Sequence, residues 1–295
     1  MKIALLDIGG TYIKFAAAQD EKPIEACEEY PTEGKKGGPH VIDRAIGLLE
    51  KLAPFDGIGV STAGLVKDGY ILYANENLPN YTGMNIKKIL QEKFGVPVAV
   101  ENDVCAAALG EAAYGRGREN PSFLCMTFGT GIGGALIHEG KLITQGGLPV
   151  GSFGHMITHK GGRLCSCGNR GCLEAYASTS ALVQAVQETT GRRLNGREIF
   201  TAFYQGEQEI QETVREWMEE IVCGLFSIIH ILNPSCIVLG GGIMNEDYII
   251  DYLKKELYDR LIPCYQEVQI IPAQLGNRAG LMGARYLTEK LLTEG

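Results

Sequence analysis

Hydrophobic positions along the chain follow two periods in turn, and this alternation predicts strands and helices. Short apolar runs typical of buried strands occur at "KIALLD" (2–7), "FDGIGVS" (55–61), "FLCMTF" (123–128) and "CIVLGGG" (236–242). Apolar residues at helical spacing predict helices at 41–53, 84–95, 104–115, 174–190, 196–205, 208–232, 246–260 and 278–292. Strands that alternate with helices in this way indicate an α/β protein with mixed sheets.

One hydrophobic pattern occurs twice. "LLDIGGTYIKFAAA" and "CMTFGTGIGGALIH" each contain an apolar strand, a Gly/Thr turn and a second apolar strand, which indicates two related halves. The second copy contains G-x-G-x-x-G, but a dinucleotide-binding fingerprint must open a helix. The following segment, "ALIHEGKLI", is β-rich and is interrupted by a Glu-Gly turn, so the dinucleotide interpretation fails.

Glycine-tipped turns can instead hold phosphate, because backbone amides without a neighbouring Cβ approach an anion closely. Asp7 precedes the first turn and would repel phosphate unless Mg²⁺ lies between them. Either turn alone favours an ordinary hairpin, whereas the pair with its acid predicts a Mg-ATP clamp. The glycines at 240–242 fit a flat nucleoside or simple tight packing. The predicted ATP and phosphate residues are Asp7, Gly9, Gly10, Thr11, Lys14, Thr127, Gly129, Thr130, Gly131, Gly133, Gly240, Gly241 and Gly242.

Composition narrows the functional classes. The chain has 295 residues, which is enough for two domains, and 45% of them are hydrophobic. The net charge of −8 argues against a nucleic-acid surface. No apolar run is long enough to span a membrane, and the N-terminal run is expected to be a buried strand, so we predict a cytoplasmic protein. Six scattered cysteines are expected to be small buried side chains: Cys27, Cys105, Cys125, Cys223, Cys236 and Cys264.

Asp103 stands directly before an Ala-rich helix in "VENDVCAAALGE". Aspartate is a favoured N-cap residue, worth about 1 kcal/mol. It is also the residue type that accepts an alcohol proton during phosphoryl transfer to a sugar. Both roles are compatible, and Asn102 beside it could hydrogen-bond a substrate hydroxyl.

Three cysteines and one histidine cluster in "GHMITHKGGRLCSCGNRGCLE" with the spacing H-x₉-C-x-C-x₄-C. A Cys₃His set predicts a closed, structural zinc site formed by His155, Cys165, Cys167 and Cys172. The alternatives are a chance cluster or a disulfide, and His159 is a rival ligand. Glu174 follows the last cysteine closely, so a braced loop would hold it for contacts to sugar hydroxyls, unless it only adds charge to a first helical turn.

These segments, together with "IVLGGGI", resemble the ROK family of sugar kinases and sugar-responsive repressors over nearly the whole chain. The resemblance implies a two-domain actin/hexokinase (ribonuclease H-like) fold with an interdomain cleft. Its expected domains are residues 1–115 plus 278–295 and residues 116–277. It also implies ATP- and Mg²⁺-dependent phosphorylation of a hexose or amino sugar, a zinc-braced loop and a homodimer, to which 208–232 could contribute.

By resemblance, Asp103 matches the catalytic base and the four cluster residues match the zinc ligands. The matched or nearby sugar contacts are Ser61, Gly64, Asn77, Asn102, Asp103, Ser152, His155 and Glu174. Ser152 is a departure, because family glucokinases usually have a glutamate there in G-E-x-G-H. A shorter, uncharged serine leaves room for an N-acyl amino sugar, such as N-acetylmannosamine, or a β-glucoside.

We therefore predict a glucokinase-type enzyme that phosphorylates a hexose, at O6, with Asp103 as the base. A kinase for an amino sugar or β-glucoside is the first alternative. A non-catalytic sugar-binding regulator is the second. No helix-turn-helix is expected, because the first strand begins at Lys2.

Overall fold

The computed structural model describes residues 1–20, 24 and 27–294, and it divides into two compact units. The first unit contains Met1–Pro121, Glu139–Val150 and Asn277–Gly295, of which Gly295 lies outside the described residues. The second unit contains Ser122–His138 and Gly151–Gly276. The boundaries expected from the sequence put 116–121, 139–150 and 277 in the second domain, whereas the structure groups all three with the first unit.

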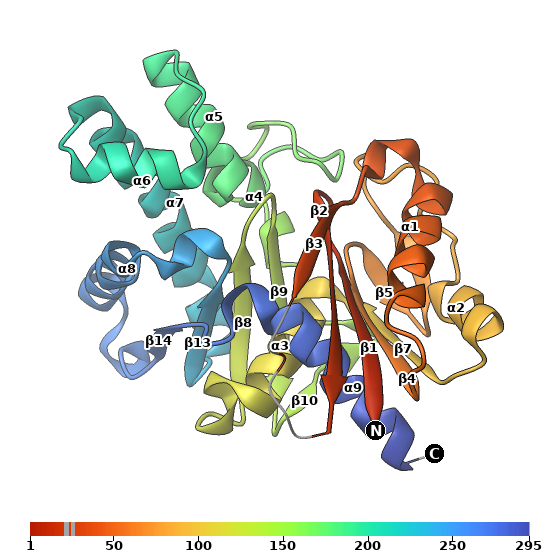
Figure 1. Cartoon of the computed structure of the whole chain (residues 1–295). Coiled ribbons are helices and arrows are strands. Elements are labelled where there is room, and N and C mark those ends of the chain that lie inside the picture. The colour runs from red at the N-terminus through yellow and green to blue at the C-terminus, as the bar shows by residue number, and fades with distance from the viewer. Residues whose placement is uncertain (21–23, 25–26, 295) are drawn as a thin grey trace. The chain divides into compact units, whose positions relative to one another are not determined.

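The sheet of the first unit has the strand order β3-β2-β1-β4-β7. Strands β1 (Lys2–Ile8), β4 (Gly57–Thr62) and β7 (Val98–Asn102) are parallel, whereas β2 (Tyr12–Gln19) and β3 (Glu28–Pro31) continue the sheet antiparallel. Side chains of β1 alternate between two cores: Ala4, Leu6 and Ile8 pack with α1 (Gly38–Glu50), and Ile3 and Leu5 pack with α9 (Ala279–Glu294). Figure 1 shows α1 and α9 on opposite sides of these strands.

Helices α2 (Ile86–Phe94) and α3 (Asp103–Tyr114) complete the first unit. Asn85 caps α2 by accepting the Lys88 amide, and Gly95 ends it in the left-handed conformation. Helix α9 lies so close to β4 that a Cβ on Gly59 would be 2.5 Å from the Ala284 carbonyl oxygen. The remaining short strands are β5 (Leu65–Lys67), β6 (Tyr70–Tyr73), β10 (Lys141–Leu142), β11 (Thr144–Gln145) and β12 (Leu148–Pro149).

The second unit repeats this topology. Its strands β8 (Phe123–Phe128), β13 (Cys236–Gly240) and β14 (Gln269–Pro272) are parallel, and β9 (Ile132–His138) pairs antiparallel with β8. Residues 1–10 and 121–130 have the same order of buried and exposed positions. The predicted duplication is therefore confirmed at the level of strand order.

Five helices surround the core of the second unit: α4 (Glu174–Ala177), α5 (Thr179–Thr190), α6 (Gly196–Tyr204), α7 (Gln208–Leu232) and α8 (Asp247–Arg260). Helix α7 has the predicted limits, and its apolar side lies in the main core of the unit. The prediction of one helix over 174–190 was wrong. Ser178 is extended and caps α5 by accepting the Ala181 amide, and its carbonyl accepts the Trp217 indole, so it separates α4 from α5.

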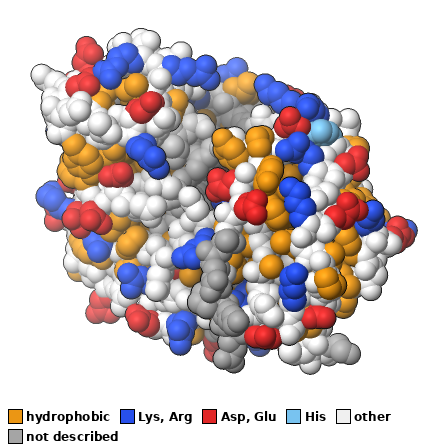
Figure 2. Space-filling view, in the orientation of Figure 1, with side chains coloured by type: hydrophobic (Ala, Val, Ile, Leu, Met, Phe, Trp, Pro, Cys, Tyr) orange, Lys and Arg blue, Asp and Glu red, His pale blue; other side chains and the backbone are white. Residues whose placement is uncertain are grey.

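The cysteine prediction was also only partly right. Cys105, Cys125 and Cys236 are buried, Cys27 is half-buried, and Cys223 and Cys264 are exposed. Among the described residues, no helix is long and apolar enough to cross a membrane. Lys and Arg are intermixed with Asp and Glu over the face in Figure 2.

Candidate functional site

The first glycine turn joins β1 to β2 in the first unit. The Gly9 amide donates to the Tyr12 carbonyl (3.0 Å) and closes the turn. Thr32, which follows β3, fixes the turn twice: its amide donates to the Thr11 carbonyl (2.8 Å) and its hydroxyl to the Gly9 carbonyl (2.7 Å). Within the described chain, the amides of Gly10 and Thr11 have no acceptor. A Cβ at Gly10 would meet nothing within 4 Å, so the space beside these amides is open to an anion.

Asp7 lies at the end of β1, where two side chains fix its carboxylate. The Ser61 hydroxyl donates to Oδ1 (2.7 Å), and Lys14 Nζ lies 3.4 Å from Oδ2. A Cβ on Gly280 of α9 would lie 2.7 Å from Ser61 Oγ, so glycine is needed for this arrangement. Ser61 is fully buried, and the structure therefore does not present its hydroxyl to a sugar, as the resemblance had implied. It instead positions Asp7.

Asp103 opens α3, but it is not the N-cap. Asn102 caps the helix, since its Oδ1 accepts the amides of Val104 (3.0 Å) and Cys105 (3.1 Å). The Asn102 Nδ2 donates to the Gly64 carbonyl and to Asp103 Oδ1, both at 2.8 Å. All four hydrogen-bonding positions of the Asn102 amide are therefore occupied within the protein. Asn102 orients Asp103 instead of offering a free group to a substrate.

The environment of Asp103 raises its pKa to about 6. Burial is the larger cause, because it penalises the ionised form, and the negative charge of Asp7 adds to it. A carboxylate with a pKa near the working pH is mostly ionised at pH 7 and still accepts a proton readily. Asp103 is thus suited to general base catalysis.

Two other predicted sugar contacts belong to the first unit. Asn77 is exposed, and its backbone amide donates to Asn75 Oδ1 (3.1 Å). Gly64 has a φ of 100°, and a Cβ there would lie 2.8 Å from the Tyr73 carbonyl oxygen. Glycine is therefore required for the turn whose carbonyl holds Asn102.

The second glycine turn joins β8 to β9 in the second unit. The Gly129 amide donates to the Gly131 carbonyl (2.9 Å), so it is not free for phosphate, contrary to expectation. Thr179 fixes this turn: its amide donates to the Gly129 carbonyl (3.0 Å) and its hydroxyl to the Phe128 carbonyl (3.3 Å). In the part of the chain that the structure describes, the Thr130 and Gly131 amides have no acceptor. Gly133 lies inside β9, opposite Thr127.

A cavity of about 330 Å³ adjoins the second turn. Its lining combines the turn, the start of α5 and the third glycine cluster: Phe128, Gly129, Thr130, Thr179, Ser180, Val183, Gly242 and Ile243. Gly241 has a φ of 102°, and a Cβ there would lie 2.1 Å from the Phe128 carbonyl oxygen, so it is needed for packing. Gly242 lines the cavity. Sequence reasoning missed Thr179, Ser180 and Val183, because only folding brings α5 to the turn.

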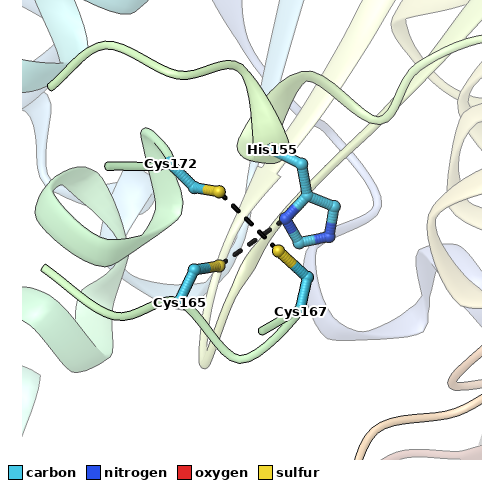
Figure 3. A group of neighbouring side chains, drawn as sticks. All are labelled: His155, Cys165, Cys167 and Cys172. Atoms are coloured by element: carbon cyan, nitrogen blue, oxygen red, sulfur yellow. Dashed lines mark hydrogen bonds between the residues drawn. The ribbon is translucent and has the colours of Figure 1, made fainter. Parts of the chain in front are cut away.

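The four predicted metal ligands lie together in the second unit, and their side chains point toward one another (Figure 3). One donor atom from each lies within 4.8 Å of the others, with Cys165 Sγ 3.7 Å from His155 Nδ1 and Cys167 Sγ 3.7 Å from Cys172 Sγ. The sulfur separation is far longer than the roughly 2.05 Å of a disulfide. Three thiols and one imidazole are a donor set that suits structural zinc.

His159, the rival ligand, lies outside this group. Its ring stacks on Tyr176 at 3.9 Å between centroids, and its Nε2 lies 3.5 Å from Glu220 of α7. A Cβ on Gly171 would be 1.7 Å from the His159 carbonyl oxygen, which explains a glycine beside the last cysteine. His159 therefore joins the loop to α4 and α7.

Glu174 and Ser152 are the remaining predicted sugar contacts. Glu174 Oε2 accepts the Ile132 amide (2.9 Å), and Oε1 accepts the Ser166 hydroxyl (2.7 Å). Ser152 is exposed, and its carbonyl accepts the His155 amide (3.0 Å). The second unit thus holds a charged group fixed at both oxygens and a short neutral side chain near the histidine.

Comparison with known proteins identifies the family to which this chain belongs. The model of the ROK family matches residues 3–291, so the chain belongs to the ROK family. It is 32% identical to the β-glucoside kinase of Listeria monocytogenes, over 97% of both chains, and 32% identical to the glucokinase of Streptomyces coelicolor, over 97% and 96%.

A solved structure with the same fold is the ROK glucokinase of Streptomyces griseus in complex with glucose and AMPPNP. Its TM-score is 0.86 at 28% identity, over 98% of this chain and 100% of that one. The fold is therefore the two-domain actin/hexokinase fold, as the sequence predicted.

Proposed function

We propose that this protein is a sugar kinase that transfers the γ-phosphoryl group of ATP to O6 of a hexose. The observation that carries the proposal is Asp103: Asn102 orients its carboxylate, and burial with the Asp7 charge raises its pKa to about 6. Asp103 accepts the hydroxyl proton while the sugar oxygen attacks the γ-phosphorus and ADP leaves. Such a base accelerates the reaction by about 10²–10⁴-fold.

The remaining residues are proposed to bind ATP, Mg²⁺ and zinc. The Thr130 and Gly131 amides bind ATP phosphates, as do Gly10, Thr11 and Lys14, and the cavity beside Gly242 takes the nucleoside. Asp7 would hold Mg²⁺, which neutralises phosphate charge when bound. The Cys₃His set would hold structural zinc and brace the loop that precedes Glu174.

Asn77, His155 and Glu174 would bind the sugar hydroxyls, with Ser152 beside them. The chain is equally identical to a β-glucoside kinase and to a glucokinase, so the identity of the sugar has to be inferred from these residues. Ser152 is exposed and uncharged where a glutamate would contact hydroxyls. This favours an N-acyl amino sugar or a β-glucoside as the second candidate.

The test is ADP formation with Mg-ATP over a panel of glucose, N-acetylglucosamine, N-acetylmannosamine and a β-glucoside such as cellobiose. We expect turnover with at least one sugar, and a loss of about 10²–10⁴-fold in kcat for Asp103→Asn. No turnover over the panel, or full activity of Asp103→Asn, would refute the kinase. Sugar binding without ATP hydrolysis would instead support the sugar-responsive regulator.

A further inference from the structure

The Glu174 carboxylate connects three segments of the second unit. Its Oε2 accepts the Ile132 amide (2.9 Å), directly after the second glycine turn. Its Oε1 accepts the Ser166 hydroxyl (2.7 Å) and lies 3.5 Å from Cys165 Sγ, both in the metal loop. One side chain thus joins the loop that carries the metal ligands to the turn proposed to bind phosphate.

The position of Ser166 is fixed by the fold of the metal loop. It stands between Cys165 and Cys167, two of the clustered ligands. The Gly168 amide donates to the Cys165 carbonyl (3.0 Å), and the Cys165 amide donates to the Asn169 carbonyl (2.8 Å), so a tight turn surrounds the serine. Ser166 is exposed, and water could satisfy its hydroxyl, yet the hydroxyl donates to a carboxylate. Hydrogen bonds to charged groups are the stronger class.

Gly131 shows how closely Glu174 lies against the turn. A Cβ at this position would be 2.3 Å from Glu174 Oε2, whereas a Cβ at Gly129 would meet nothing within 4 Å. The turn therefore has no room for a side chain where the carboxylate lies. Any shift of Glu174 has to change the contacts of Ile132 and Gly131.

We propose that Ser166 is a positioning residue that transmits the geometry of the metal loop to Glu174 and, through Glu174, to the second glycine turn. Its consequence for catalysis rests on the proposed function, in which Glu174 contacts the sugar. Its structural consequence does not, because the Ser166–Glu174–Ile132 chain of hydrogen bonds involves only groups of the protein.

Ser166→Ala removes only the hydroxyl, and Ser166→Thr restores one. Arg170→Ala is the matched control: Arg170 is exposed in the same loop and donates to the Gly162 carbonyl (3.2 Å), away from Glu174. Three quantities are measured for each: zinc content, amide hydrogen exchange of a peptide spanning 129–135, and the KM values for sugar and for ATP.

For Ser166→Ala we expect unchanged zinc content, faster exchange at Ile132 and a sugar KM raised about fivefold, in line with the loss of one hydrogen bond. The KM for ATP should rise less, by about twofold, because Glu174 binds the Ile132 amide and not the Thr130 and Gly131 amides that are proposed to bind phosphate. Ser166→Thr should restore exchange and KM, and Arg170→Ala should match the wild type.

Unchanged exchange in Ser166→Ala would overturn the proposal. So would loss of zinc from that variant, because the serine would then maintain the loop itself. If the wild-type protein phosphorylates no sugar, the proposed function fails, while the exchange result still decides whether Ser166 controls the turn.

Discussion

The two glycine turns close in the same way, but different chemistry surrounds them. In each, a threonine from a distant segment donates through its amide and its hydroxyl to carbonyls of the hairpin: Thr32 in the first unit and Thr179 in the second. The first turn follows Asp7, which Ser61 and Lys14 hold, whereas the equivalent position before the second turn is the neutral Thr127. The second turn has a carboxylate too, but it comes from Glu174 and binds the backbone.

This difference indicates that the same type of glycine turn has a different role in each unit. At the first turn the acid belongs to the strand itself and remains beside open amides, where a divalent cation would be needed to admit phosphate. At the second turn the acid is already hydrogen-bonded at both oxygens, so it supports the turn instead of binding a cation. Equivalent substitutions in the two turns should therefore have unequal effects.

The largest difference in kcat/KM is expected between the equivalent variants Asp7→Asn and Thr127→Ala. Without its charge, Asp7 would no longer favour Mg²⁺ beside the phosphates, and kcat/KM should fall by about 100-fold or more. Thr127→Ala removes only a neutral hydroxyl group and should cost less than about tenfold. Steady-state kinetics at varied Mg²⁺ measures both, and equal losses would refute the assignment of the cation to the first turn.

Removal of the metal should disturb only the second turn. Cys167→Ser should lose bound zinc and destabilise the second unit by several kcal/mol, because metal binding and folding of such a loop are coupled. Amide exchange should then rise at 129–132 and stay unchanged at 7–12. Cys264→Ser, at an exposed cysteine outside the cluster, should change stability by less than about 0.5 kcal/mol. Zinc retained in Cys167→Ser would contradict the ligand set.

The pH dependence should report the acid near the first turn. Because Asp103 has a pKa of about 6 and acts as its carboxylate, kcat/KM should fall about tenfold per pH unit below that value. The folded-state pKa lies above the ordinary 3.8, so the stability that Asp103 contributes is fully present below about pH 4 and is lost as pH rises through 6. Asp103→Asn should consequently raise the melting temperature at pH 8. A rate profile flat to pH 5 would argue against this base.

The smallest effects are expected from alanine substitutions at two glycines of the second turn, which should change the KM values of different substrates. Gly131→Ala displaces the Glu174 carboxylate from its hydrogen bonds, so the sugar KM should rise a few-fold and the protein should lose about 1–3 kcal/mol of stability. Gly129→Ala meets no protein atom but adds a methyl group to the wall of the cavity that is proposed to take the nucleoside, so it should instead raise the KM for ATP. The KM for each substrate is measured with the other substrate held at saturation. If both variants changed the same KM, the contact with Glu174 would not explain the difference between the two glycines.

Features that depend on local sequence were predictable. The two hairpins follow from apolar runs around glycines, and α7 follows from uninterrupted helical periodicity that ends before Asn233. The cluster of three cysteines and one histidine was predictable because these residues lie within 18 positions of the chain, among glycines, at a spacing typical of metal-binding loops.

Features that depend on distant contacts were not predictable. Thr32 and Thr179 bond to the turns only after each sheet has formed, so nothing near the glycines reveals them. Ser61 lies in a segment that resembles a substrate turn, but Gly280 of α9 packs against it and its hydroxyl turns inward to Asp7. Asn102 and Asp103 are both good caps, and the residue that caps α3 is Asn102, whose amide also donates to the Gly64 carbonyl, 38 residues away.

Helix α9 has a consequence for how the protein is made. It covers one side of β1 and β4, which lie in residues 2–62, yet it occupies residues 279–294. Ile3 and Leu5 must therefore wait until residues 279–294 have been translated before their side of the sheet is shielded from water. The second unit contains no segment beyond Gly276, so it does not depend on α9 for its completion. During synthesis, the second unit can therefore mature before the first unit, whose last segment follows it in the chain.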